Sequence, residues 1–88
     1  MNEIVLTQRL KDDFKALPGA VQKKFKKQIR FLAENPKHPS LQIHRIQGTA
    51  YWEFYIDRSY RCIIRQEGTV FYLLAAGPHK VVDEFSRK

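Results

Sequence analysis

Apolar residues in the first half of the chain recur at intervals of three and four, the spacing that places them on one face of an α-helix. One stripe, within TQRLKDDFKAL, consists of Leu10, Phe14 and Leu17. A second stripe, within AVQKKFKKQIRFLAEN, consists of Val21, Phe25, Ile29 and Leu32. Thr7 stands where a hydroxyl caps the first helix, and Pro18 with Gly19 separates the two stripes. The pattern predicts two amphipathic helices that are joined by a tight turn and packed as a hairpin.

After the segment NPKHPS, residues 35–40, apolar and polar residues alternate with the period of two that is typical of strands. In YWEFYID one face carries Trp52, Phe54 and Ile56, and the other carries Glu53 and Tyr55. In YRCIIRQ one face carries Tyr60, Cys62 and Ile64, and the other carries Arg61, Ile63 and Arg65. Together with VFYLLAAG, these segments predict an antiparallel meander of three strands with short turns.

Three shorter segments complete the prediction. EIVLT, residues 3–7, is typical of a short strand. LQIHRI, residues 41–46, predicts a short strand or an extended arm that ends at Gln47–Gly48, and VVDEF predicts a last helical turn. The order is therefore β-α-α-β-β-β in an α+β fold, with residues 1–88 as a single domain. The apolar stripes of the helical hairpin and the apolar face of the antiparallel sheet bury each other.

The bulk composition narrows the function classes. The net charge of +7 over 88 residues points to a phosphate-bearing or acidic partner, with a merely solubilising surface as the alternative. The apolar runs are too short to span a membrane, and the N-terminus lacks the features of a leader peptide, so we expect a soluble, cytoplasmic protein. The only cysteine, Cys62, stands among apolar residues and is expected to be a small buried hydrophobe.

One predicted helix concentrates the positive charge. Between positions 20 and 33 the second helix contains five basic residues and no acidic one: Lys23, Lys24, Lys26, Lys27 and Arg30. Such a run is commonly a solvated helix face. A purely solubilising helix more often mixes both signs at a spacing of four residues, so this run also suits an anionic polymer or an acidic peptide.

The polar face of the sheet gathers side chains with catalytic chemistry. The alternation places four of them there: Glu53, Tyr55, Arg61 and Arg65. Gly77–Pro78 turns the chain after the third meander strand, and we expect His79 and Lys80 to reach the rim of the same face. A cross-strand Glu–Arg salt bridge explains part of this arrangement without any function.

These side-chain types suit RNA cleavage by the 2′-hydroxyl group. That reaction needs a base for the hydroxyl proton, cations for the phosphorane and an acid for the leaving 5′-oxygen. Histidine titrates closest to neutral pH, and guanidinium groups offer paired donors to phosphate. The three histidines have no metal-ligand spacing, and no phosphate loop or nucleophile elbow occurs, so the sequence predicts neither a metal site nor a cofactor.

Several motifs resemble the RelE/ParE toxin superfamily of type II toxin–antitoxin systems, and the RelE-like branch in particular. They are LTQRLKDDFKALP with the helix after it, ENPKHPS, Trp52–Glu53, Tyr60–Arg61 and AAGPHKVVDEF. The resemblance runs from about residue 3 to residue 85. It implies a β-α-α-β-β-β toxin fold, ribosome-dependent cleavage of mRNA and neutralisation by a small antitoxin protein.

The resemblance also implies roles for individual residues. Arg61 matches the arginine that contacts the scissile phosphate, and His79 falls where relatives carry a general acid. Phe85 falls where many relatives have an aromatic residue that stacks on or orients the nucleotide. The chain departs from the family at Glu53 and Tyr55, where several relatives have lysine or arginine, and at Lys80, where aspartate is frequent. Glu53 is then either the base, as a carboxylate is in some relatives, or a salt-bridge partner.

The first reading is therefore an mRNA interferase, an endoribonuclease that inhibits translation. Its catalytic residues are Arg61, His79 and Glu53, and its partners are the ribosome and mRNA. The residues expected to bind RNA or phosphate are Arg65, Tyr55, Lys80, Phe85, Lys23, Lys27 and Arg30. Two alternatives stay open: a ParE-like inhibitor that binds DNA gyrase as a protein and catalyses nothing, and a catalytically inactive basic RNA-binding relative.

Overall fold

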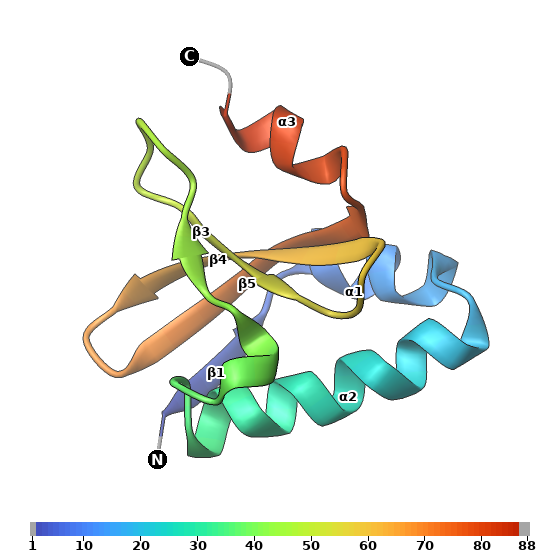
Figure 1. Cartoon of the computed structure of the whole chain (residues 1–88), viewed down its shortest axis with the longest axis horizontal. Coiled ribbons are helices and arrows are strands. Elements are labelled where there is room, and N and C mark those ends of the chain that lie inside the picture. The colour runs from blue at the N-terminus through green and yellow to red at the C-terminus, as the bar shows by residue number, and fades with distance from the viewer. Residues whose placement is uncertain (1, 87–88) are drawn as a thin grey trace.

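The computed structural model describes residues 2–86 and has the predicted α+β architecture (Figure 1). The strands are β1 (Glu3–Leu6), β2 (His44–Arg45), β3 (Trp52–Tyr55), β4 (Tyr60–Glu67) and β5 (Val70–Pro78). The helices are α1 (Gln8–Ala16), α2 (Gly19–Glu34) and α3 (Val81–Ser86), with a 3-10 turn, η1, at Pro39–Leu41. The two consecutive helices, the three-strand meander and the last helical turn are confirmed.

The five strands form one mostly antiparallel sheet in the order β1-β5-β4-β3-β2. β3, β4 and β5 are antiparallel neighbours, as the alternation predicts. β1 pairs with β5 in parallel, with Glu3 opposite Val70, so the first strand depends on the last one for its partner. β2 extends the other edge as a two-residue strand antiparallel to β3. The segment 41–46 therefore contains a short strand rather than only an extended arm.

The ends of α1 follow from the residues that flank it. The hydroxyl of Thr7 accepts a hydrogen bond from the Leu10 backbone N–H at 3.2 Å and donates one to the Leu73 carbonyl at 2.7 Å. This confirms the predicted cap and ties the start of the helix to β5. Leu17 is extended because it precedes Pro18, and the helix ends at Ala16.

None of the helices in the described part of the chain is long and apolar enough to cross a membrane.

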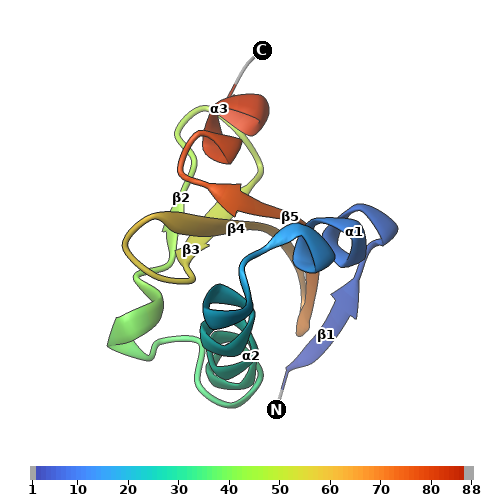
Figure 2. The same cartoon turned by 90° about the vertical axis from the view of Figure 1, so that its right-hand side faces the viewer.

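The first face of the sheet is covered by α1 and α2 (Figure 2). The Phe25 ring lies at the centre of this layer, with centroids 5.8 Å from Phe14 and 6.1 Å from Phe54. The fully or nearly fully buried side chains of this core include Leu10, Leu17, Val21, Leu32, Leu41, Ile56, Cys62, Ile64 and Leu73. The helical stripes and the apolar strand faces thus meet as the sequence pattern predicts, although Phe14 and Ile29 are only partly buried.

The second face of the sheet is not the open polar surface that the alternation predicts. α3 lies across it (Figure 2), where Ile46, Ile63, Ala75 and Val81 form a second buried cluster. This cluster continues into a polar region in which both Glu53 and Arg61 are only 6% exposed. Alternation along a strand predicts the direction in which a side chain points, but not which element covers it.

A β-bulge in β5 lets the second cluster form. Ile63 pairs with Ala75 while the next residue, Ile64, pairs with Leu73, so β5 contains one extra residue, Leu74. Leu74 and Ala75 both belong to the second cluster, and Leu73 belongs to the main core. The bulge therefore shifts the alternation of β5 and supplies the apolar surface on which α3 packs.

Candidate functional site

Four side chains from neighbouring strands meet on the α3 face of the sheet: His44, Glu53, Tyr55 and Arg61. His44 is paired with Glu53 in the β2–β3 ladder, and Tyr55 is paired with Arg61 in the β3–β4 ladder. Residues that are opposite each other in a ladder share a face. We call these four residues the polar cluster. The predicted proximity of Glu53, Tyr55 and Arg61 is confirmed, and His44 is an addition that the sequence analysis missed.

Arg61 is held by its surroundings on three sides. Its Nη1 donates hydrogen bonds to the carbonyls of Asp57 and Arg58, both at 2.9 Å, and to that of Tyr60 at 3.2 Å. Its guanidinium carbon lies 3.5 Å from the centre of the Tyr55 ring. Arg61 thus fastens the β3–β4 turn and stacks on an aromatic ring, which are structural tasks that a lysine cannot perform equally.

The Nε donor of this arginine is unusual because it is buried without a partner. Arg61 Nε makes no hydrogen bond within the described residues, and it lies 3.6 Å from Glu53 Oε1. Such a buried donor normally costs free energy unless a partner satisfies it. Its position between a carboxylate and an aromatic ring marks a point at which an additional acceptor is favourable.

His44 completes the cluster from the edge strand. Its Nε2 lies 3.1 Å from Glu53 Oε2, and its Nδ1 lies 2.9 Å from the Gln42 carbonyl oxygen. The His44 side chain is 52% exposed, whereas that of Glu53 is 8% exposed. A closed hairpin between LQIHRI and YWEFYID, with its turn at Gln47–Gly48, is the sequence signal that places His44 opposite Glu53.

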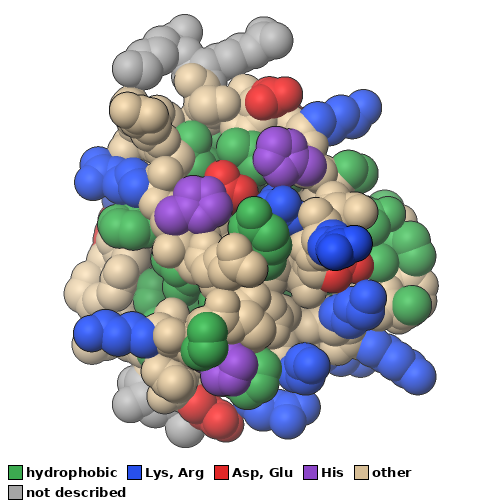
Figure 3. All heavy atoms as spheres, in the orientation of Figure 1, with side chains coloured by type: hydrophobic (Ala, Val, Ile, Leu, Met, Phe, Trp, Pro, Cys, Tyr) green, Lys and Arg blue, Asp and Glu red, His purple; other side chains and the backbone are tan. Residues whose placement is uncertain are grey.

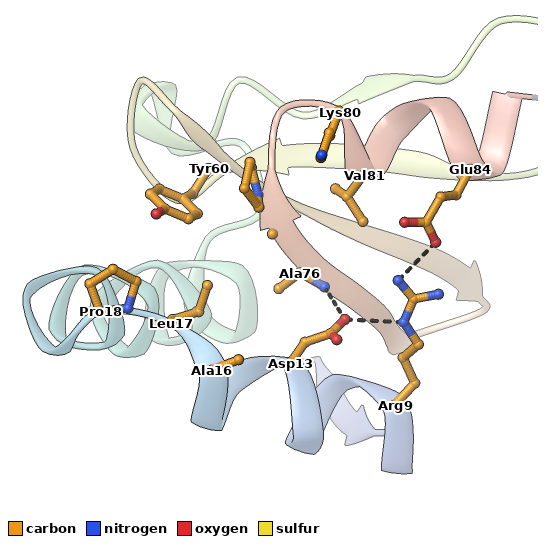
Figure 4. A pocket seen from close by; sticks show the side chains of 12 residues that line it. Arg9, Asp13, Ala16, Leu17, Pro18, Tyr60, Ala76, Lys80, Val81 and Glu84 are labelled. Atoms are coloured by element: carbon orange, nitrogen blue, oxygen red, sulfur yellow. Dashed lines mark hydrogen bonds and ion pairs between the residues drawn. The ribbon is translucent and has the colours of Figure 1, made fainter.

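His79 and Lys80 take different sides of the chain. Gly77 pairs with Arg61, and the His79 N–H donates to the Ser59 carbonyl at 2.9 Å, which continues the ladder beyond β5. Strand alternation therefore places the exposed His79 on the face of Gly77 and Arg61, at the rim where it was expected. Lys80 instead lines a cavity of about 330 Å³ between α1, β5 and α3 (Figure 4). The structure does not bring Lys80 to the polar cluster.

The cavity in Figure 4 contains the contact that fastens α3 to α1. Arg9 Nη2 lies 2.8 Å from Glu84 Oε1, and Arg9 Nε lies 3.2 Å from Asp13 Oδ2. The hydrogen bond that Arg9 donates to Glu84 raises the pKa of Arg9 above its ordinary value. Asp13 also accepts a hydrogen bond from the Ala76 backbone N–H at 2.9 Å. The acidic side chains of Asp13 and Glu84 thus already neutralise Arg9 in this cavity.

Two further predicted site residues lie apart from the polar cluster. Arg65 is on the same strand as Arg61, but four residues along a strand correspond to about 13 Å. Its guanidinium forms an ion pair with Glu67 on the same strand. Phe85 packs edge-on against Tyr51 with a centroid distance of 5.2 Å, and it is half-buried beside the second apolar cluster. In this structure both side chains have structural partners.

The basic helix reaches the polar cluster through one groove. A cavity of about 410 Å³ lies between α2, η1 and the β3–β4 turn, and its lining includes Lys24, Lys27, Tyr55 and Arg58. Lys24 is within 3.6 Å of Asp57 in the same lining. Lys23 and Arg30 are exposed on α2 but are not part of this lining. Tyr55 is thus shared between the groove and the cluster.

The face of the molecule shown in Figure 3 carries charged side chains of both signs. Figure 3 shows two histidine side chains near an acidic and a basic side chain, with further Lys and Arg side chains over the part of the surface where α2 lies. Among residues 2–86 there is no group of three or more His, Cys, Asp or Glu side chains that fits a metal ion. The arrangement offers a carboxylate, imidazole groups and guanidinium groups for acid–base chemistry on an anionic ligand.

Cys62 lies on the other face of the sheet and takes no part in the cluster. It is completely buried in the main core, as predicted. Burial raises the pKa of its thiol well above the ordinary value, because a thiolate is poorly solvated there. The residue therefore acts as a small apolar side chain and not as a nucleophile.

Comparison with known proteins reveals a likeness in structure and not in sequence. No family model matches the chain, and no curated protein matches it by sequence. The toxin in the RelB–RelE antitoxin–toxin complex from Methanococcus jannaschii is similar in structure, with a TM-score of 0.76, 19% identity, and coverage of 94% of this chain and 99% of that one.

Two further solved structures have the same fold. YafQ from E. coli strain BL21(DE3) has a TM-score of 0.75 at 15% identity and covers 93% of this chain and 98% of its own. A YoeB/ParE toxin from Agrobacterium tumefaciens has a TM-score of 0.71 at 19% identity and covers 88% of this chain and 98% of its own. The chain therefore has the fold of the RelE/ParE toxins, which confirms the fold that the sequence motifs imply.

Proposed function

We propose that this protein is the toxin of a type II toxin–antitoxin system and that it cleaves mRNA on the ribosome, without a metal ion, in the cytoplasm. The toxin-like fold supports the class. The observation that carries the proposed activity is the buried Glu53–Arg61 pair, in which the Arg61 Nε–H has no hydrogen-bond partner among the described residues and the guanidinium stacks on the Tyr55 ring. A buried donor without a partner costs free energy, so an ion pair with a purely structural role is expected to have its donors satisfied.

In the proposed reaction the RNA 2′-oxygen attacks the adjacent phosphorus. Glu53 takes the hydroxyl proton as the O2′–P bond forms. The Arg61 guanidinium, which is anchored by the hydrogen bonds of its Nη1 to backbone carbonyls, stabilises the charge that develops on the phosphorane. His79 gives a proton to the 5′-oxygen as the P–O5′ bond breaks. The products are a 2′,3′-cyclic phosphate and a 5′-hydroxyl, so protons and bonds balance without a co-reactant.

The groove between α2 and the β3–β4 turn is the proposed path of the RNA strand toward this centre. Lys27 and Arg58 provide charge along it, and Tyr55 provides an aromatic edge at its end. Lys23 and Arg30 lie farther out on α2, where contacts to ribosomal RNA add affinity without reading sequence. In this proposal Lys80, Arg65 and Phe85 support RNA binding only from outside the polar cluster.

The proposed regulatory partner is a small antitoxin protein. Two of the similar structures are complexes, one of RelB with RelE and one of DinJ with YafQ. By analogy with these complexes, we expect a small antitoxin protein to bind this basic chain and to neutralise it. DNA gyrase is a partner only under the alternative in which the chain acts as a ParE-like inhibitor.

Expression of the chain in a bacterial host without an antitoxin tests the proposal. We expect growth arrest with mRNA cleavage, and we expect Arg61→Ala and His79→Ala each to relieve it. His38→Ala is the matched control, because this histidine stacks on Phe31 with a centroid distance of 3.8 Å, away from the polar cluster. A double variant of Arg61 and His79 that remains as toxic as the parent disproves the site. Growth arrest with DNA damage and intact mRNA supports the gyrase alternative instead.

A further inference from the structure

The structure assigns a role to His44 that neither the sequence motifs nor the fold likeness provides. We propose that His44 and Glu53 share one proton as a unit, in which His44 is the positioning residue that fixes the carboxylate and leaves Glu53 Oε1 to accept the RNA 2′-hydroxyl proton. The catalytic part of this inference rests on the proposed function. The proton-sharing part concerns the free protein and is tested separately.

The atoms around the imidazole ring determine how many protons it holds. The Gln42 carbonyl oxygen, 2.9 Å from Nδ1, only accepts hydrogen bonds, so Nδ1 carries a hydrogen. The opposite nitrogen, Nε2, lies 3.1 Å from a carboxylate oxygen of Glu53. A neutral nitrogen and an ionised carboxylate at this distance repel each other through their lone pairs. One proton on either atom removes the repulsion, so the pair holds one proton more than a neutral imidazole and a separate carboxylate.

The surroundings favour the form in which that proton is on the ring. Arg61 is always charged, and its Nε lies 3.6 Å from Glu53 Oε1, which favours an ionised carboxylate. His44 is half exposed, so water solvates an imidazolium there. Burial disfavours an ionised carboxylate, and the positive charges beside Glu53 offset this cost. The other ring near His44 is that of Tyr55, 6.4 Å away, and the charged neighbour on β2 is Arg45. The imidazolium of His44 and the guanidinium of Arg61 thus flank the buried carboxylate of Glu53.

The two carboxylate oxygens of Glu53 therefore have different roles in the proposed unit. Oε2 faces the imidazolium of His44, and Oε1 faces the unpartnered Arg61 Nε–H. When Oε1 accepts the 2′-hydroxyl proton, the unit gains one positive charge at the moment the phosphorane becomes dianionic. The proton and the charge therefore move in the direction that stabilises the transition state. Without His44, the Glu53 carboxylate loses the contact that orients Oε1.

Nitrogen-15 NMR of the histidine rings in the free protein tests the shared proton. At pH 7.5 about one in ten exposed imidazole rings carries two protons. We expect both His44 nitrogens to be protonated in the parent, and one of them to lose its proton in Glu53→Gln, because an amide donates to Nε2. Glu67→Gln removes an exposed carboxylate elsewhere on the sheet and is the matched control. A singly protonated His44 ring in the parent, or no difference in Glu53→Gln, overturns the inference.

Cleavage kinetics with translating ribosomes test the catalytic part. We expect His44→Ala to lower kcat about ten- to a hundredfold with KM unchanged, and Glu53→Gln to lower it by about 10² or more. Thermal unfolding of each variant excludes loss of fold as the cause, and His44→Gln, which keeps a neutral donor, is expected to recover part of the rate. Parent-like kcat in His44→Ala overturns the positioning role. Absence of cleavage by the parent disproves the proposed function, while the NMR result still decides whether the proton is shared.

Discussion

The two faces of the sheet differ in the kind of side chain that they bury, although the same strands form both. The face under α1 and α2 is filled by apolar side chains around Phe25 and Phe54, and its role is burial. The face under α3 is apolar around Ile63 and Val81 but becomes polar within one strand width, where Glu53 and Arg61 are also buried. Burial alone therefore does not distinguish the apolar core from the polar cluster. The second face also buries charged side chains. Removing them from water costs free energy, and an apolar surface does not carry this cost.

The largest expected loss of stability is on the first face. Phe25→Ala removes a completely buried ring that contacts both α1 and β3, so we expect the free energy of unfolding to fall by about 3 to 5 kcal/mol. Urea denaturation monitored by circular dichroism measures this change. Phe31→Ala is the matched control on the same helix, because Phe31 is only partly buried. Equal losses for the two variants contradict the assignment of Phe25 to the centre of the core.

On the second face, Arg61 is expected to matter for both stability and activity. Arg61→Ala removes the hydrogen bonds to the β3–β4 turn and leaves the buried Glu53 with His44 alone, so we expect a loss of about 2 to 4 kcal/mol. Arg61→Lys keeps the charge but not the planar contacts, and we expect an intermediate loss. Denaturation curves measured beside cleavage rates separate the two effects. Parent-like stability of Arg61→Ala contradicts the anchoring role.

A smaller effect is expected where β5 meets the start of α1. Thr7→Ala removes the cap of the helix and the hydrogen bond to Leu73, so we expect a loss of about 1 to 2 kcal/mol. Thr7→Ser keeps the hydroxyl group and serves as the control. Chemical denaturation of both variants measures the difference, and an equally large loss in Thr7→Ser assigns the effect to the methyl group instead of the cap.

The smallest effect is expected at the contact between α1 and α3. Glu84→Gln weakens an ion pair with Arg9 in which both side chains are about half exposed, so we expect less than about 1 kcal/mol. Hydrogen exchange of the α3 amides is the more sensitive measurement, and we expect faster exchange there with α2 unchanged. A large global loss of stability shows that α3 is held mainly by this contact and not by the apolar cluster around Val81.

The sequence predicted local structure better than the partners of each element. The stripes of α1 and α2 and the alternation of β3 and β4 are visible within short windows, because each repeats the period of its own secondary structure. The position of β1 is not visible in this way, since its partner β5 begins at Val70, far along the chain. The extra residue at Leu74 also breaks the alternation on which a prediction for β5 depends.

The candidate site was predicted in part for the same reason. Glu53, Tyr55 and Arg61 lie on two adjacent strands joined by a short turn, so alternation and pairing suffice to bring them together. His44 was missed because β2 has only two residues, which is too short for a period to be recognised. The burial of Glu53 and Arg61 was missed because it depends on contacts outside their own strands. Glu53 contacts His44 on β2, and Arg61 contacts the Tyr55 ring and the backbone of the β3–β4 turn.

We propose that the sheet face beneath α3, which carries the polar cluster, cleaves mRNA on the ribosome. Primer extension on a defined mRNA in a purified translation system tests it most directly, with the parent and His79→Ala compared at equal concentration. His79 is exposed, so its removal is not expected to change the melting temperature. We predict cleavage by the parent only when ribosomes translate the message, and a rate at least about 10² lower for the variant. Equal rates for the two proteins, or an intact message with the parent, contradict the account.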